Sequence, residues 1–243
     1  MRRSARFVKN RSVKKRVVPR VPSKRQPSLS PRNWCGKLEG IPCFIMGNAP
    51  SLNKIKDFSI FDDYFTVGIN RVFFKYDPTI LIWQDLALWS QENKRVKQLR
   101  AIKYCREGSE TEGGKYTFKL NGRESKLSHS TDTLYGRGSS GAISYQFVHA
   151  LKCDPIILVG MDCRYDKKTG DTDFYGKNSM HKRHTLPDCV SGLKFIKQNS
   201  SGKTILNCSD NKVFSERYTI EEVVEMIKDK KTSREEIENL LLS

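Results

Sequence analysis

The chain has 243 residues, a formal net charge of +17 and 37% hydrophobic residues. This length suits one sizeable α/β domain with a tail. The longest apolar runs are about half the length of a bilayer-spanning helix, and no apolar segment follows the basic N-terminus, so we expect neither a transmembrane helix nor a secretory signal. The seven cysteines contain no Cys-x-x-Cys pair, which suits free thiols in a reducing cytoplasm.

Positive charge is concentrated in residues 1–34, which contain twelve Lys and Arg residues, four prolines and no acidic residue. This composition, without helical or strand periodicity, is typical of a disordered arm. A polycation releases counterions when it meets phosphates, so nucleic acid is the favoured partner, with an anionic membrane surface or a solubilising tail as the alternatives. The side chains expected to contact nucleic acid are Arg2, Arg3, Lys14, Lys15, Arg16, Arg20, Lys24 and Arg25.

The remaining sequence alternates short apolar runs with turns and helical patterns, which predicts an α/β fold with a single doubly wound, mostly parallel sheet. We expect a nucleotide-binding domain over 35–215 and C-terminal helices over 216–243 that pack on it. The predicted strands are 41–46, 64–69, 79–83, 103–104, 156–159 and 204–207. The predicted helices are 86–102, 142–151, 189–198, 219–229 and 233–242, the last two opened by the capping boxes Thr219 with Glu222 and Ser233 with Glu236. The polar stretch 106–136 is interpreted as a lid, or as an insertion with a hairpin near 115–120.

The first predicted strand breaks into a turn that is a candidate nucleotide site. Gly47 permits a sharp backbone turn, and Asn48 and Ser51 offer short polar side chains. In α/β folds, nucleotides bind at the carboxyl edge of the sheet. Asn70, Asp85 and Asp162 follow later strands and should meet at the same edge. The simpler alternative is an ordinary tight turn after a core strand.

A second glycine-rich element precedes the helix predicted over 142–151. Arg137 would add a fixed positive charge there. The residues that open the helix are Ser139, Ser140 and Gly141. A helix N-terminus presents unpaired N–H groups and the positive end of its dipole, so it can hold a phosphate. The alternative is a helix that Ser139 or Ser140 simply caps.

Metal chemistry is weakly indicated. Asp171 and Asp173 form an Asp-x-Asp that could chelate a metal on a nucleotide diphosphate, although solvated loop charge explains them as well. No Walker loop is present, and the spacing of the Cys and His residues fits no compact zinc pattern. The sequence therefore predicts no resident metal, and it allows Mg²⁺ without requiring it.

Several of these motifs, taken together, resemble the bacterial lipooligosaccharide sialyltransferases and the related MptE-like 6-hydroxymethylpterin pyrophosphokinase superfamily. Gly-Asn-Ala-Pro-Ser-Leu at 47–52 is similar to their Gly-Asn-Gly-Pro-Ser-Leu motif, with Ala49 in place of the second Gly. The strand-end Asn70, the Ser-Ser-Gly at 139–141 and the Gly-Met-Asp at 160–162 have counterparts in the same order, and so does the Leu-Asn-Cys-Ser at 206–209. The basic arm has none.

This resemblance implies a Rossmann-like sheet of the glycosyltransferase type, with a nucleotide-sugar donor held by the first turn, Asn70 and the Ser-Gly helix start. It implies His184 as the general base on the acceptor hydroxyl, with His181 in reserve and Asp162 at the same catalytic edge. An imidazole has a pKa near neutrality, which suits that task, although a solvated histidine pair is the alternative. Tyr165 and Tyr175 would bond the leaving phosphate.

The function predicted from these features is transfer of a sugar from a nucleotide sugar to a hydroxyl acceptor. The arm suggests a polyanionic acceptor such as DNA with hydroxylated bases, as in phage DNA modification in the host cytoplasm. One alternative is an ATP- and Mg²⁺-dependent pyrophosphokinase with Asp85 and Asp162 on the metal. The other is a non-catalytic nucleic-acid-binding or virion-associated protein. The sugar, the base of the donor and the oligomeric state are left open.

Overall fold

The computed structural model describes residues 30–109, 116–122, 126–136, 139–177 and 185–243. The eight basic side chains expected to contact nucleic acid lie outside the described residues, as do Arg137, His181 and His184. None of the helices in the described ranges combines the length and the apolar character that a membrane crossing requires.

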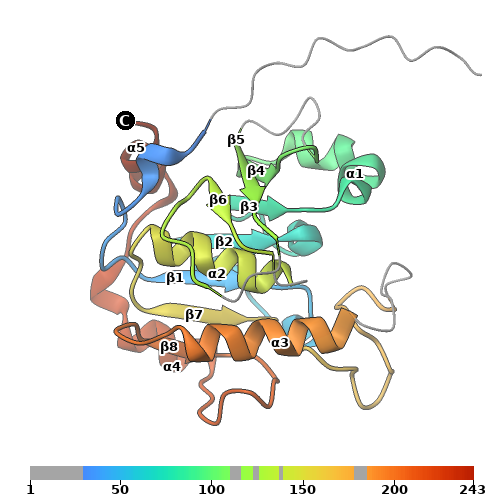
Figure 1. Cartoon of the computed structure of the whole chain (residues 1–243). Helices are drawn as coiled ribbons and strands as arrows, with labels where there is room; N and C mark the ends of the chain where they lie inside the picture. The colour runs from blue at the N-terminus through green and yellow to red at the C-terminus, as the bar shows by residue number, and fades with distance from the viewer. Residues whose placement is uncertain (1–29, 110–115, 123–125, 137–138, 178–184) are drawn as a thin grey trace, which may run out of the picture.

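The described strands form one eight-stranded sheet in which every pairing is parallel, with the order β6-β5-β4-β3-β2-β1-β7-β8 (Figure 1). This confirms the predicted doubly wound α/β fold. The strands are β1 (Cys43–Met46), β2 (Phe65–Ile69), β3 (Ile80–Trp83), β4 (Ile102–Arg106), β5 (Tyr116–Leu120), β6 (Thr133–Leu134), β7 (Ile156–Val159) and β8 (Ile205–Asn207).

The strand order reverses direction once. From β1 the chain moves outward strand by strand to β6, and it then returns to place β7 on the other side of β1. The connections that leave β1 and β7 therefore diverge, which opens a crevice at the carboxyl ends of these two strands. The carboxyl ends point to the right in Figure 1.

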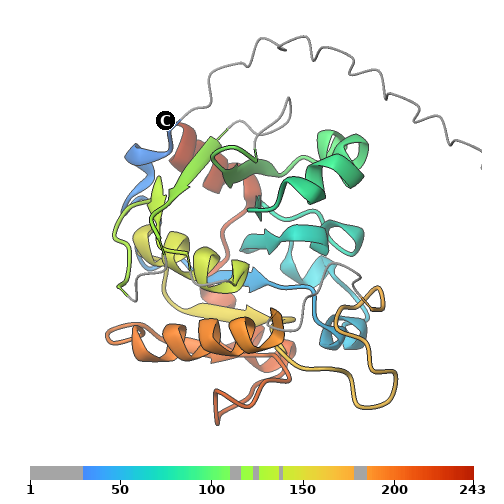
Figure 2. The ribbon, with the colours of Figure 1, turned by 45° about the vertical axis from the view of Figure 1, so that its right-hand side comes forward.

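Helices cover both faces of the sheet. α2 and α3 lie side by side on one face, whereas α1 and α4 pack on the other together with the short 3-10 helices η2 and η3 (Figure 2). The α-helices are α1 (Leu86–Gln98), α2 (Ser140–Ala150), α3 (Thr185–Gln198), α4 (Ile220–Met226) and α5 (Arg234–Leu242). The 3-10 helices are η1 (Arg32–Trp34), η2 (Pro50–Lys54), η3 (Ser59–Phe61), η4 (Asn70–Phe74) and η5 (Lys228–Lys230).

Alternate side chains of the central strands enter two separate cores. Ile45 of β1 packs on the α2 side, and Phe44 and Met46 pack on the α1 side. Because both faces are covered, β1, β3 and β7 are buried along their whole length and read as continuous apolar runs. This is why the sequence pattern locates them well.

The two capping boxes are confirmed. Thr219 accepts from the Glu222 backbone N–H at the start of α4, and Ser233 accepts from the Glu236 backbone N–H at the start of α5. Trp34, which the sequence places at the end of the arm, is buried against Tyr104, Tyr116 and Phe147.

The prediction that 106–136 is a lid or an insertion with a hairpin was wrong. Within the described part of this stretch, β5 and β6 continue the sheet in parallel instead of forming a hairpin or a lid. Tyr116 and Phe118 point into the core beside Tyr104 of β4. A parallel pairing needs a crossover connection and not a tight turn, so the local pattern that predicts a hairpin does not reveal it.

Candidate functional site

A cavity of about 470 Å³ lies at the carboxyl ends of β1, β2, β3 and β7, where the strand order reverses. We call it the switch-point cavity. The first turns of α2 and α3 complete its wall. It brings together nine of the residues that the sequence singled out: Gly47, Asn48, Asn70, Asp85, Ser139, Ser140, Gly141, Asp173 and Tyr175. Their roles in binding stay predictions.

The turn after β1 is pressed against the end of β7. The Gly47 N–H donates to the Val159 carbonyl at 2.8 Å, and the Ala49 N–H donates to the Gly160 carbonyl at 3.0 Å. A Cβ at Gly47 would overlap the backbone oxygen of Gly160, so glycine is required by close approach of two backbones. This contact sets the floor of the cavity.

Two asparagines that line the cavity have buried side-chain oxygens without a hydrogen-bond donor among the described residues. Asn48 donates through Nδ2 to the Ile69 carbonyl at 2.9 Å, which fixes its orientation and leaves its Oδ1 without a donor among the described residues. Asn70 has a positive φ of 50°, and its buried Oδ1 also lacks a donor there. A buried acceptor without a partner is costly, so both oxygens favour a ligand that donates hydrogen bonds.

The start of α2 supplies donors. Ser139 is the N-cap residue, but its side chain makes no capping hydrogen bond, and the first turn of α2 contains no acidic residue. The Ser140 hydroxyl accepts from Gln84 Nε2 at 2.9 Å, which ties the helix to the end of β3. The first-turn N–H groups and the helix dipole thus favour an anion.

Arg71 is a cavity residue that the sequence reasoning missed. It is the one basic side chain among the described residues that line the cavity, and only 12% of the side chain is exposed. Its Nε donates to Glu92 of α1 at 3.2 Å, and its guanidinium stacks 5.8 Å from the centre of the Tyr175 ring. Its position directly after Asn70, at the end of β2, was the available signal.

Tyr175 has a fixed position and a hydroxyl that can form hydrogen bonds. Burial and the nearby Asp173 raise the pKa of Tyr175 to about 12. Its hydroxyl therefore stays protonated at neutral pH. Tyr175 also packs edge-on to Phe74 of η4 and to its neighbour Phe174, so the ring has a defined position.

Three described site residues that the sequence predicted, Ser51, Asp162 and Tyr165, do not line this cavity. Asp162 is buried and accepts from the Ser51 hydroxyl at 2.6 Å, from the Ser51 N–H at 3.0 Å and from the Asp210 N–H at 2.9 Å. Asp162 thus joins η2 to the loop after β8, and the geometry gives its predicted catalytic role no support. Tyr165 is 61% exposed.

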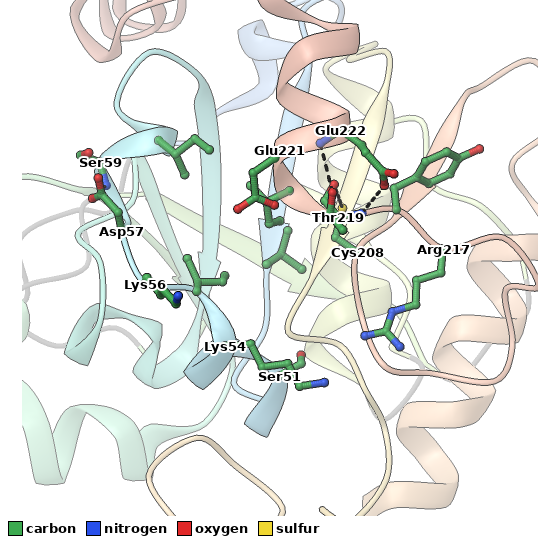
Figure 3. Close-up of a pocket in the computed structure, with 15 residues that line it drawn as sticks. Ser51, Lys54, Lys56, Asp57, Ser59, Cys208, Arg217, Thr219, Glu221 and Glu222 are labelled. Carbon is green, nitrogen blue, oxygen red and sulfur yellow. Dashed lines mark hydrogen bonds between the residues drawn. The ribbon is translucent and has the colours of Figure 1, made fainter.

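A larger pocket, of about 890 Å³, lies on the other side of the β1 turn, between η2 and the start of α4 (Figure 3). We call it the α4 pocket. Apolar side chains such as Ile55, Val159 and Ile220 form part of its lining, with Lys54 and Arg217 among its charged groups. Both of these cations pair with Asp210. Ser51 is the only predicted site residue among those that line it.

The two predicted catalytic histidines belong to 178–184, which lies outside the described residues. Thr185, which follows His184 in the sequence, lines the switch-point cavity. In the described part of the chain, no three His, Cys, Asp or Glu side chains gather as a metal site would require.

No protein-family model and no curated protein matches the sequence. Among solved structures, the chain is similar to a MAf glycosyltransferase from Magnetospirillum magneticum, with a TM-score of 0.47 and 12% identity over 84% of this chain and 40% of that one. It is also similar to the sialyltransferase CstII from Campylobacter jejuni, solved with the substrate analogue cytidine-5'-monophosphate, with a TM-score of 0.41 and 16% identity over 71% of this chain and 82% of that one.

The chain thus spans less than half the length of the first of these proteins. At identities of 12% and 16%, the likeness concerns the fold alone.

Proposed function

We propose that this protein is a glycosyltransferase that binds a nucleotide sugar in the switch-point cavity and transfers the sugar to a hydroxyl acceptor. The observation that carries the proposal is that Asn48 and Asn70, whose buried side-chain oxygens have no described donor, line the same cavity as the start of α2. The two oxygens accept hydrogen bonds, as ribose hydroxyls or a base amino group would require. The helix start and Arg71 offer the donors that a phosphate requires.

The charge of the cavity favours a donor with few phosphates. Its described lining contains three carboxylates, Asp85, Asp173 and Asp188, and one cation, Arg71. A nucleoside triphosphate carries more negative charge than a sugar nucleotide, so it would need a metal ion to enter. The pyrophosphokinase alternative would place Mg²⁺ on Asp85 and Asp162, but only Asp85 lines the cavity. The site therefore supports sugar transfer better.

The proposed reaction breaks the bond between the anomeric carbon and the donor phosphate while an acceptor hydroxyl attacks that carbon. Charge grows on the leaving phosphate, where the α2 N–H groups, Arg71 and the Tyr175 hydroxyl can stabilise it. His184 is the proposed base that removes the acceptor proton. Its sequence neighbour Thr185 lines the cavity, which supports the assignment.

A thermal-shift panel with CMP, UDP, GDP, ADP and ATP, each with and without Mg²⁺, tests the donor. A ligand that binds only the native state raises Tm by mass action. We expect one nucleoside mono- or diphosphate to raise Tm without Mg²⁺. A rise only with ATP and Mg²⁺ would favour the pyrophosphokinase, and no rise at all would favour a non-catalytic binding protein.

Asn70→Gly sharpens this test. Glycine tolerates the positive φ of residue 70, so the variant removes the carboxamide without straining the backbone. We expect about tenfold weaker nucleotide binding, the value of roughly one hydrogen bond. Asn239→Ala, on the exposed face of α5, is the matched control and should bind as the unmodified chain does. Equal affinities for both variants would contradict the site.

We further propose that the acceptor is a polyanion, with DNA that carries hydroxylated bases as the first candidate. The support is the excess of Lys and Arg in residues 1–34. A base in a duplex must also be flipped out before it can react. Removing residues 1–29 keeps the buried Trp34 and should abolish DNA binding at low salt. Unchanged DNA affinity in that variant would end this part of the proposal.

A further inference from the structure

Two of the seven cysteines line the switch-point cavity and contact each other. Cys163 follows the end of β7, and Cys189 lies in the first turns of α3. Their thiols share a hydrogen bond, and both residues are free and partly exposed. The contact therefore joins two cavity walls that are separate in sequence.

The two sulfurs have unequal chemistry. The hydrogen bond to Cys189, together with burial, raises the pKa of Cys163, which stays a thiol and donates. The hydrogen bond from Cys163 lowers the pKa of Cys189, and a second one with Ser139 acts in the same direction. Burial and the carboxylates of Asp173 and Asp188 oppose that shift without reversing it. Cys189 is consequently the stronger nucleophile, because the thiolate is the reactive form.

A second cysteine pair provides an internal comparison. Cys43 of β1 and Cys153 are also hydrogen-bonded, but both are fully buried in the core. Burial, the largest cause, raises the pKa of Cys43. A reagent in solvent reaches the cavity pair and cannot reach the core pair while the protein is folded.

We propose that Cys163 and Cys189 are a reactive thiol pair in the wall of the switch-point cavity, which a peroxide converts into an intramolecular disulfide. The Cys189 thiolate attacks one peroxide oxygen, hydroxide leaves, and a sulfenic acid forms on Cys189. The Cys163 sulfur then attacks the Cys189 sulfur, and the sulfenic oxygen departs as water with the Cys163 proton. The two thiols lose two electrons and two protons, and the peroxide is reduced to two waters.

Oxidation and ligand binding should compete at this site. Both cysteines line the same cavity as Asn48 and the start of α2, so we expect a nucleotide in the cavity to cover them. Cys189 is also hydrogen-bonded to Ser139, the N-cap residue of α2, which is the helix that would hold the phosphate. This second part rests on the proposed function, whereas disulfide formation itself does not.

The first test treats the full chain with limiting hydrogen peroxide, blocks the remaining thiols by alkylation and maps the peptides by mass spectrometry under non-reducing conditions. We expect a Cys163–Cys189 linkage before any Cys43–Cys153 linkage. Cys163→Ser should leave a sulfenic acid on Cys189 that dimedone traps, because the resolving thiol is missing. Cys153→Ser, in the core pair, is the matched control and should still form the cavity disulfide.

Failure of the cavity pair to react, while the exposed Cys35 is oxidised, would overturn the proposal. The unmodified chain alone decides this point, so a variant that fails to fold does not blur it.

The second test repeats the oxidation with saturating CMP, UDP or GDP, whichever raises Tm. We expect the cavity disulfide to form at least tenfold more slowly, with oxidation of Cys35 unchanged. A nucleotide that raises Tm without protecting the pair would refute the competition. If no nucleotide raises Tm, the proposed function fails, and the peptide map still decides whether the disulfide forms.

Discussion

The two pockets on either side of the β1 turn differ in how their polar groups are satisfied. In the α4 pocket, Lys54 and Arg217 both pair with Asp210, and Thr219 and Glu222 satisfy each other in a capping box. In the smaller switch-point cavity, Asn48 and Asn70 keep buried oxygens without a described partner. By volume alone, the α4 pocket would be the better candidate for a binding site. The unsatisfied acceptors and the uncapped start of α2 instead favour the switch-point cavity as the binding site, because these groups would gain hydrogen bonds from a ligand.

The largest expected effect is at the backbone contact that separates the two pockets. Gly47→Ala places a methyl group against the Gly160 carbonyl, which is backbone and cannot move alone. We expect a loss of about 1–3 kcal/mol in the free energy of unfolding, together with loss of nucleotide binding. Urea unfolding and thermal shift with the nucleotide measure both.

Gly141→Ala is the matched comparison for Gly47→Ala. Its methyl group would meet the end of the Met161 side chain, which can rotate away. We expect a smaller loss of stability than for Gly47→Ala. A larger loss of stability in Gly141→Ala than in Gly47→Ala would mean that the β1–β7 contact is not the rigid part of the cavity.

The next largest effect is expected on nucleotide binding, at the cavity residue Arg71. Arg71→Ala removes the guanidinium held by Glu92 and Tyr175. A hydrogen bond to a charged group contributes about 1.5–3 kcal/mol, so nucleotide affinity should fall about ten- to hundredfold by calorimetry. Arg95→Ala removes a similar cation that stacks on Phe74 and does not line the cavity. An equal loss in Arg95→Ala would show that the effect is not local.

The smallest effect on binding belongs to the α4 pocket. Although burial opposes ionisation, Lys54, Arg217 and Arg164 hold the pKa of Asp210 below its ordinary value. A depressed pKa in the native state stabilises the protein above the unfolded pKa of about 4, and this stability is lost as pH falls through the native pKa. Asp210→Asn should therefore lower Tm at pH 7 and flatten its decline between pH 5 and about 2.

The same variant should leave nucleotide affinity unchanged at pH 7. A clear loss of affinity in Asp210→Asn would indicate that the α4 pocket takes part in binding, and the contrast between the two pockets would fail.

Much of the sheet could be predicted from local pattern. β1, β3 and β7 are short apolar runs bounded by turns, and a strand buried on both faces has that appearance wherever it occurs. The polar residues that end such strands, including Asn48 and Asn70, could be assigned to one edge because all parallel strands share their carboxyl end. The capping boxes were equally local.

Other features depended on tertiary packing. β5 and β6 join the sheet in parallel, where local pattern had predicted a lid or a hairpin. Asp162 accepts hydrogen bonds from Ser51 and Asp210, which are distant in the sequence, and does not line the cavity. A strand-end carboxylate has the same appearance in the sequence whether it faces a ligand or a neighbouring loop.

The sequence by itself determined six of the eight described strands, their order along the chain and the set of polar residues at their ends, since these follow from period and turn chemistry. Only the tertiary structure decided which of those residues face one cavity. It placed Arg71 beside Tyr175 and Cys163 against Cys189, which are far apart in the chain. The physical reason is that the direction of a side chain at a strand end depends on the helices and strands that pack around it. This packing forms only when the whole domain folds.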